Sequence, residues 1–190
     1  MSYKEEIKRL GKFIPINDNP TGNLTKIEID NIGVTIGAKL PNDYTDFLLN
    51  FGMGSFENNI GFKPIKEDSE YIHPEKTGIP NFKFYASSIS VFFGIHEKRI
   101  YDILDNFNTY LDRSPNLFLP ILTDGLGNLI GILLDKENYG KIYFWDHESE
   151  WDEDDYLDDT GQEMPEEAKF QNLWLLADNF TDFLKRCSAG

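Results

Sequence analysis

The chain has 190 residues, of which 40% are hydrophobic and 14% aromatic, enough to form the core of one domain. Its 18 basic and 33 acidic side chains give a formal net charge of −15, which disfavours binding to nucleic acid and to anionic membrane surfaces. The single cysteine, Cys187, excludes an intrachain disulfide and a cysteine-based zinc cluster. The charged N-terminus lacks the apolar core of a signal peptide, and every apolar run is far shorter than a membrane span, so we expect a cytoplasmic protein.

Three helices are expected in the N-terminal part of the chain. Residues Tyr3–Phe13 place apolar side chains on one side, and the proline- and asparagine-containing segment Pro15–Gly22 is typical of a loop. Isoleucines at helical spacing predict a second helix from about Leu24 to Ile36. The segment Leu40–Phe51 begins with proline and capping-type residues and continues as an apolar stripe, which predicts a third helix that ends at Gly52.

The middle of the chain changes to the pattern of strands. Residues Gly61–Pro80 are polar and contain several prolines and glycines, which indicates a loop or a weak edge hairpin. Phe82–Phe84 and Ser90–Ile95 are rich in aromatic and β-branched residues and are predicted as strands. A helix is predicted over Ile100–Leu111, where apolar residues recur at helical spacing.

A meander of strands and a last helix are expected in the C-terminal half. Leu117–Thr123 and Leu129–Leu134 flank a glycine-containing connection that suits a hairpin, and Lys141–Trp145 provides a third strand. Phe170–Cys187 places apolar residues on one helical face and predicts an amphipathic helix. Helices and antiparallel strands are segregated along the chain, so the fold class is α+β, in a single domain with an N-terminal helical pair.

Most of the negative charge lies in one segment, Asp146–Glu167. It contains twelve acidic residues and no lysine or arginine, which leaves the other 168 residues with a net charge near −3. Most acidic runs are solvated surface. Aromatic and apolar residues are interleaved here, which favours an interface for a basic partner, although Trp151 and Tyr156 could equally pin the segment to the sheet.

The sequence contains no recognisable catalytic or metal-binding motif. His73, His96 and His147 lack zinc-ligand spacing, and the acidic run lacks the order of an EF-hand loop. The connection Asp124–Asn128 lacks the lysine of a phosphate loop, and Cys187 lies on an apolar helical face, as a core residue would. We therefore expect no cofactor, no metal and no enzymatic activity. The alternative is a hydrolase built on a dispersed pair of acids.

Four motifs in register resemble the SUKH superfamily, and within it the Smi/Knr-like group named from yeast cell-wall assembly regulators. The motifs are Leu-Pro-Asn-Asp-Tyr-x-x-Phe-Leu at 40–48, Leu-Pro-Ile with Asp-Gly-x-Gly-Asn at 119–128, Gly-Lys-Ile-Tyr-Phe-Trp-Asp-His-Glu at 140–148, and Leu-Ala-Asp-Asn-Phe-Thr-Asp-Phe-Leu at 176–184. The sequence departs from the family pattern at Gly33, where the family usually has Glu, and in the length of its acidic segment. The resemblance covers about residues 22–187, so we expect an N-terminal helix and linker at 1–21 and a SUKH-like domain at 22–187 with an acidic insertion at 146–167.

The resemblance implies an immunity protein that binds a cognate bacterial toxin domain, often a nuclease, without catalytic residues of its own. An acidic segment suits the basic mouth of a nuclease active site, and the expected partner is therefore a toxin with a basic surface. The alternative is an intracellular scaffold or adaptor for signalling or cell-wall synthesis partners. The residues expected to contact the partner are Asp146, Glu148, Glu150, Trp151, Asp152, Glu153, Asp154, Asp155, Tyr156, Asp158 and Asp159.

Overall fold

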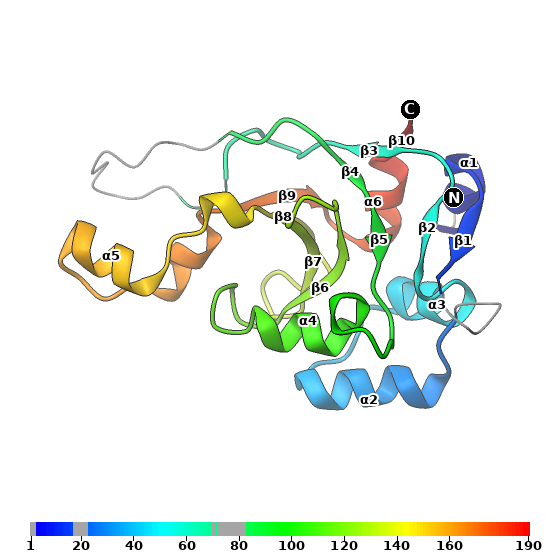
Figure 1. The fold of residues 1–190 in the computed structure, drawn as a ribbon, viewed down its shortest axis with the longest axis horizontal. Helices are drawn as coiled ribbons and strands as arrows, with labels where there is room; N and C mark the ends of the chain where they lie inside the picture. Colours follow the sequence, from blue (N-terminus) through cyan, green and yellow to red (C-terminus); the bar gives the residue numbers. More distant parts are fainter. Residues whose placement is uncertain (1–2, 17–22, 70, 72–82) are drawn as a thin grey trace.

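The computed structural model describes residues 3–16, 23–69, 71 and 83–190. Figure 1 shows a central twisted sheet with helices packed around it and one segment that extends to the far end of the longest axis. The α-helices are α1 (Tyr3–Leu10), α2 (Lys26–Ile36), α3 (Asn42–Asn50), α4 (Ile103–Thr109), α5 (Glu153–Thr160) and α6 (Phe180–Arg186). The 3-10 helices are η1 (Arg99–Tyr101), η2 (His147–Ser149) and η3 (Glu166–Phe170).

The strands form a seven-stranded sheet in the order β1-β2-β5-β6-β7-β8-β9 and a three-stranded sheet in the order β10-β3-β4. They are β1 (Phe13–Pro15), β2 (Gly54–Phe56), β3 (Ile60–Phe62), β4 (Ser87–Ile89), β5 (Val91–Phe92), β6 (Phe118–Thr123), β7 (Leu129–Leu133), β8 (Ile142–Trp145), β9 (Leu173–Ala177) and β10 (Ser188–Ala189). All the strand pairs are antiparallel. The α+β class and the mainly antiparallel sheet predicted from the sequence are therefore confirmed.

The core forms where helices meet the sheet. The ring of Phe47 on α3 lies 5.1 Å from that of Phe92 on β5 and 4.9 Å from that of Phe180 on α6, measured between centroids. All three side chains are fully or almost fully buried. Such aromatic contacts add to the free energy gained from burial alone, so α3, β5 and α6 are held as one unit.

The second and third helices were predicted correctly. Thr25 and Glu28 form a capping box at the start of α2, and Gly37 ends the helix in the left-handed conformation at φ 72°. On α3, Tyr44, Phe47 and Leu48 are buried as the apolar stripe predicted. The hairpin of β6 and β7 and the third meander strand, β8, also lie where the sequence predicted them.

The prediction of one helix over Phe170–Cys187 was wrong. Leu173–Ala177 forms β9, paired with β8 and largely buried on both faces, and only Phe180–Arg186 is helical. A short, continuous run of apolar residues can form either a buried strand or a buried helix. The sequence does not distinguish the two, because the run lacks the alternation of apolar and polar residues that marks a half-buried strand. The side chain of Asn179 accepts a hydrogen bond from the backbone N–H of Asp182, which starts α6 after the strand.

Three other boundaries differ from the predictions. The first helix ends at Leu10, because Phe13 joins the sheet in β1. The predicted helix at 100–111 begins only at Ile103, where the carboxylate of Asp102 caps it. Lys83 makes an isolated bridge and Phe84 follows without strand structure, while Phe82, His73 and part of the predicted loop 61–80 lie outside the described residues.

Candidate functional site

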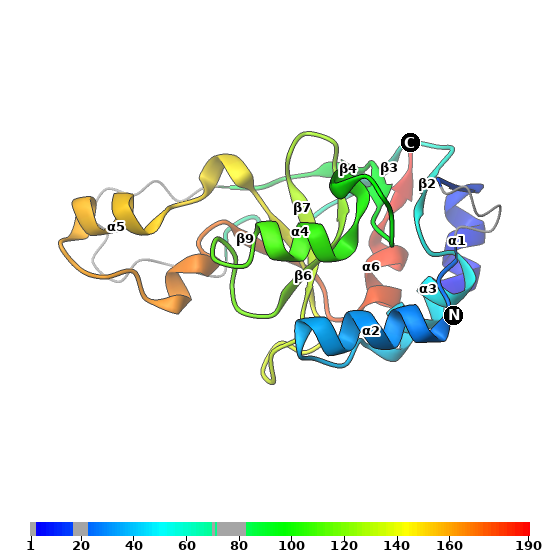
Figure 2. The ribbon, with the colours of Figure 1, turned by 60° about the horizontal axis from the view of Figure 1, so that its bottom comes forward.

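The candidate site is the acidic arm, defined here as residues 146–167, which connects β8 to η3 and β9. It consists of η2, α5 and the start of η3. Figures 1 and 2 both show α5 at the end of the molecule opposite α1, well beyond the edge of the sheet. The arm therefore presents a helix to the surroundings on an otherwise compact body.

The hairpin turn between β6 and β7 fixes the base of the arm. The carboxylate of Asp124, 7% exposed, accepts hydrogen bonds from the backbone N–H groups of Leu126 and Asn128. The amide oxygen of Asn128 in turn accepts the backbone N–H of His147 at 3.1 Å and lies 2.8 Å from its ring Nδ1. Gly127 has φ +99°, and a Cβ there would come within 3.0 Å of the His147 ring. The predicted turn therefore also positions the first residues of the arm.

Arg113 braces the arm a few residues further along. Its Nε donates to Glu150 Oε1 at 2.7 Å, and its Nη2 donates to Oε2 of the same carboxylate. The guanidinium carbon lies 5.1 Å from the centroid of the Tyr110 ring and 5.6 Å from that of Trp145. This ion pair neutralises the charge of Glu150, whose side chain is only 13% exposed.

Two aromatic residues of the arm pack against each other. The rings of Trp151 and Tyr156 lie 4.5 Å apart between centroids, and Tyr156 is 4% exposed. Burial and a hydrogen bond with Tyr156 raise the pKa of the Tyr71 hydroxyl to about 12, so this hydroxyl stays protonated near neutral pH. The arm is therefore ordered around Tyr156 by contacts within the chain.

Helix α5 carries acidic residues along its exposed faces. Asp152 caps its N-terminus by accepting the backbone N–H of Asp155 at 2.8 Å. Carboxylates in the first turn suit the helix dipole, but Asp158 and Asp159 lie in the last turn, where negative charge is unfavourable. Asp154 and Asp158, and likewise Asp155 and Asp159, are four residues apart and repel each other on the helix surface. The like-charge pairs and the carboxylates of the last turn therefore cost stability.

The structure divides the predicted contact residues into two groups. Those held by the chain itself are Asp146, whose carboxylate accepts bonds from Glu148 N–H and the Ser149 hydroxyl, and Glu150, Trp151 and Tyr156 described above. The second group is exposed and, within the part of the chain that the structure describes, makes no ion pair, although Asp152 also caps α5: Glu148, Asp152, Glu153, Asp154, Asp155, Asp158 and Asp159.

The structure adds Leu157 to the candidate site. Its side chain is 47% exposed on α5, between the repelling pairs of aspartates. A cavity of about 360 Å³ lies beside the helix start, lined by Arg113, Trp151 and Met164 together with carboxylates of the arm. The apolar residues within the acidic run were visible in the sequence, but their exposure was not.

The described residues offer little for chemistry. Among them no cluster of three or more histidine, cysteine or acidic side chains could hold a metal ion. Burial raises the pKa of the Cys187 thiol to about 12, and the side chain is 2% exposed, as predicted for a core residue. None of the helices that the structure describes has the length and apolar character needed to cross a membrane. The arm can present negative charge and an apolar side chain to another molecule.

Comparison with known proteins gives two matches. Residues 26–160 match the family SUKH_6, described as SMI1-KNR4 cell-wall, which extends from the start of α2 to the end of α5. The chain is also 28% identical over 167 residues to an SPbeta prophage-derived uncharacterized protein, YokK, of Bacillus subtilis strain 168, covering 83% of this chain and 80% of that protein. The family match includes the arm through α5 but stops before β9 and α6.

Proposed function

The chain belongs to the SUKH_6 (SMI1-KNR4 cell-wall) family, and from this premise we propose that it is a non-catalytic immunity protein that binds a bacterial toxin. The family includes immunity proteins, which act by binding rather than by catalysis. The proposed partner is a toxin domain with a basic surface, of which a nuclease is the best example. The division into an N-terminal segment at 1–21 and a family domain at 22–187 is retained as part of this proposal.

The observation that carries the proposal is the exposed, unpaired charge of α5 on a braced base. Seven of the carboxylates expected to contact the partner are exposed without an ion pair in the described part of the chain, and two like-charge pairs on α5 destabilise the helix. Arg113 and Asn128 hold the start of the arm in place. A charge that costs stability and is held in a fixed position is explained by a partner of opposite charge.

The proposed mechanism is occlusion of a basic site. The active site of a nuclease receives phosphates, so its mouth carries positive charge, and an acidic helix can occupy the same place and exclude nucleic acid. Electrostatic steering raises association rates by about ten- to a thousandfold at low ionic strength. Leu157, exposed among the aspartates, provides an apolar contact in the centre of such an interface.

The second candidate is an adaptor that binds a signalling or cell-wall synthesis partner. The description of the matched family as cell-wall proteins supports it. Both candidates use a protein partner and differ in what that partner is. A gene for a large secreted toxin next to the gene for this chain would favour the immunity protein.

The test is purification of the chain from its source cells, with identification of the bound protein and a neutralisation assay. The toxin domain alone should arrest cell growth, and co-expression of this chain should restore growth. Recovery of regulatory or cell-wall synthesis proteins, with no toxin bound, would instead support the adaptor.

A further inference from the structure

The acidic arm leaves the sheet and returns to it through a closed base. Asp146 lies directly after β8 and Asn172 directly before β9, and these two strands pair with each other. The backbone N–H of Asp146 donates to the carbonyl of Asn172 at 3.0 Å, and the side-chain amide of Asn172 donates to the carbonyl of Asp146 at 2.9 Å. Asn172 is 2% exposed, so this contact belongs to the core. The two ends of the arm therefore cannot move apart.

One short segment of the body, residues 113–117, contacts the arm near both of its ends. Near the first end, Arg113 holds the carboxylate of Glu150 through two donors. Near the second end, the backbone N–H of Asn116 donates to Glu166 Oε1 at 2.7 Å. We call residues 113–117 the latch, because this one segment binds carboxylates from both ends of the arm.

The latch is itself held by the body. Ser114 is buried, and both its backbone N–H and its hydroxyl donate to the carbonyl of Tyr110. The carbonyl of Leu117 accepts the backbone N–H of Leu134, directly after β7, at 3.0 Å. Leu117 has a φ of 61°, and among the described residues it is the one non-glycine residue with a positive φ. This conformation is unfavourable for leucine, so it persists because the surrounding contacts hold the latch in one geometry.

The arm depends on the body for its order. Helix α5 has eight residues, which is too short for a helix to be stable alone in water, and its like-charge pairs weaken it further. Its buried residue, Tyr156, packs on Trp151 and shares a hydrogen bond with Tyr71. The side chains of Arg113 and Glu166 are 48% and 41% exposed, so each latch contact alone is weak. An arm that leaves the body therefore loses α5 as well.

We propose that the latch makes the arm an order–disorder switch. The arm and α5 are ordered while Glu150 and Glu166 are bound to the latch, and they lose this order together when the latch opens. Because two contacts hold one loop with a closed base, each contact stabilises the whole arm and not only its own end. Asn116 and Glu166 are thus positioning residues for α5. The inference concerns the unbound chain and does not depend on the proposed function.

The test is amide hydrogen exchange in α5, measured by nuclear magnetic resonance. The backbone N–H groups of Tyr156 and Gly161 donate within this helix and report its opening. Glu166→Ala should accelerate exchange at both amides about fivefold, and Arg113→Ala should do so by a similar factor. The double variant should show about twenty-fivefold acceleration, because both contacts stabilise one unit.

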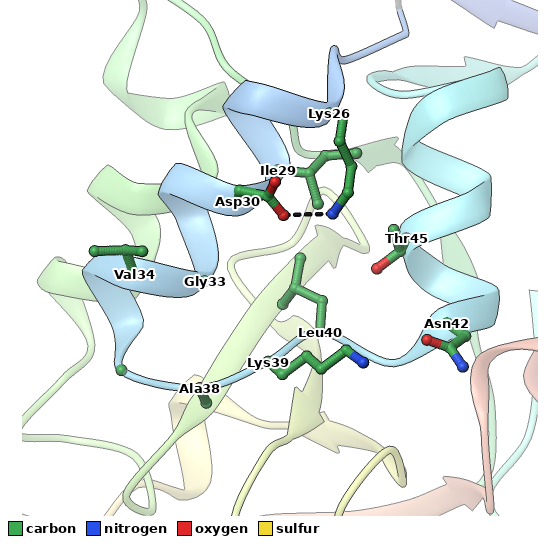
Figure 3. Close-up of a pocket in the computed structure, with 11 residues that line it drawn as sticks. Lys26, Ile29, Asp30, Gly33, Val34, Ala38, Lys39, Leu40, Asn42 and Thr45 are labelled. Atoms are coloured by element: carbon green, nitrogen blue, oxygen red, sulfur yellow. Dashed lines mark hydrogen bonds and ion pairs between the residues drawn. The ribbon is translucent and has the colours of Figure 1, made fainter.

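Two matched variants separate the latch from the other contact of Glu166, its ion pair with Lys169 at 3.5 Å. Glu166→Gln keeps an oxygen acceptor for the Asn116 N–H, so its α5 amides should exchange more slowly than those of Glu166→Ala. Lys169→Met removes only the ion pair and should change exchange about twofold or less. Helix α2 is the internal reference. Figures 1 and 2 place it away from the arm, and Figure 3 shows it beside a groove of about 760 Å³ on the main body.

Faster exchange around Glu166 with no change at Tyr156 would show that the two ends open independently, and would overturn the proposal. Equal exchange in Glu166→Gln and Glu166→Ala would exclude the bond from Asn116 as the contact that matters. An effect of Lys169→Met as large as that of Glu166→Ala would assign the role to the ion pair. Acceleration in α2 together with α5 would mean a loss of stability of the whole fold. No partner enters these measurements, so their failure leaves the proposed immunity function untouched.

Discussion

Arg113 binds Glu150 through two donors of one guanidinium, which itself lies over the rings of Tyr110 and Trp145. The interaction joins the end of the α4 region to the acidic arm, 37 residues later in the chain. The ion pair neutralises one carboxylate of the arm and holds the arm in a fixed orientation relative to the body. Glu150, one of the residues expected to meet a partner, is therefore held by a contact inside the chain.

Replacing Arg113 with alanine should loosen the arm without unfolding the body. The loss of a two-donor, partly exposed ion pair costs about 1 kcal/mol, which corresponds to about a fivefold rise in local opening. Hydrogen exchange should therefore accelerate in α5 and remain unchanged in β6 and β7. Arg99→Ala is the control, because it removes a more exposed ion pair, with Asp105, elsewhere. Unchanged exchange in α5 would contradict the bracing role of Arg113.

Neutralising the last turn of α5 should stabilise the helix and weaken partner binding. The double variant Asp158→Asn, Asp159→Asn removes two like-charge pairs and two charges from the negative end of the helix dipole. These changes together stabilise the helix by about 0.5–1 kcal/mol. Slower amide exchange in α5, together with a lower association rate for the basic partner, is the expected pair of results. Slower exchange with unchanged binding would place the interface elsewhere.

Asp43, from the Leu-Pro-Asn-Asp-Tyr motif, should be important for stability. One carboxylate oxygen accepts both the backbone N–H of Thr181 at 2.9 Å and its hydroxyl at 3.0 Å, which ties α3 to the start of α6. Asp43→Ala should lower the free energy of unfolding by about 1–3 kcal/mol, measured by urea denaturation. The control, Asp46→Ala, affects a half-exposed carboxylate 3.8 Å from Lys4 and should cost about 0.5 kcal/mol. Equal losses for the two variants would refute the link.

Cys187 should be unreactive while the protein is folded. Burial raises the pKa of its thiol to about 12, and the thiolate is the reactive form. Burial of the neutral thiol makes its full contribution to stability below the ordinary pKa of a cysteine. That contribution is lost as the pH rises through about 12. A thiol reagent at about pH 8 should therefore label the protein only after denaturant is added. Rapid labelling of the folded protein would show that the thiol is accessible.

The sequence predicted those parts of the fold that carry local signals. The capping residue Thr25, the left-handed Gly37 and the turn after Thr123 each act within a few residues, and the elements beside them lie where expected. The strand β9 could not be recognised in this way. Its identity depends on pairing with β8, and a run of apolar residues carries no period that reveals such pairing.

The candidate site was predictable in composition but not in detail. The charge of residues 146–167 and its position after a strand are evident from the sequence. The division between braced and exposed residues depends on Arg113 and Tyr71, which lie far away in the chain. Helix α5 itself was not predicted, because repelling aspartates disfavour a helix, although its cap from Asp152 is a local signal.

The most direct test of the account is the salt dependence of binding to the recovered partner, compared between two variants of equal charge. One variant neutralises the arm by Asp154→Asn, Asp155→Asn, Asp158→Asn and Asp159→Asn. The control neutralises four exposed acids elsewhere by Glu57→Gln, Glu97→Gln, Glu137→Gln and Asp178→Asn. Wild type and control should lose about tenfold or more in affinity between about 0.05 M and 0.5 M salt, whereas the arm variant should bind weakly and lose little. Equal salt dependence for both variants would contradict the arm as the binding surface.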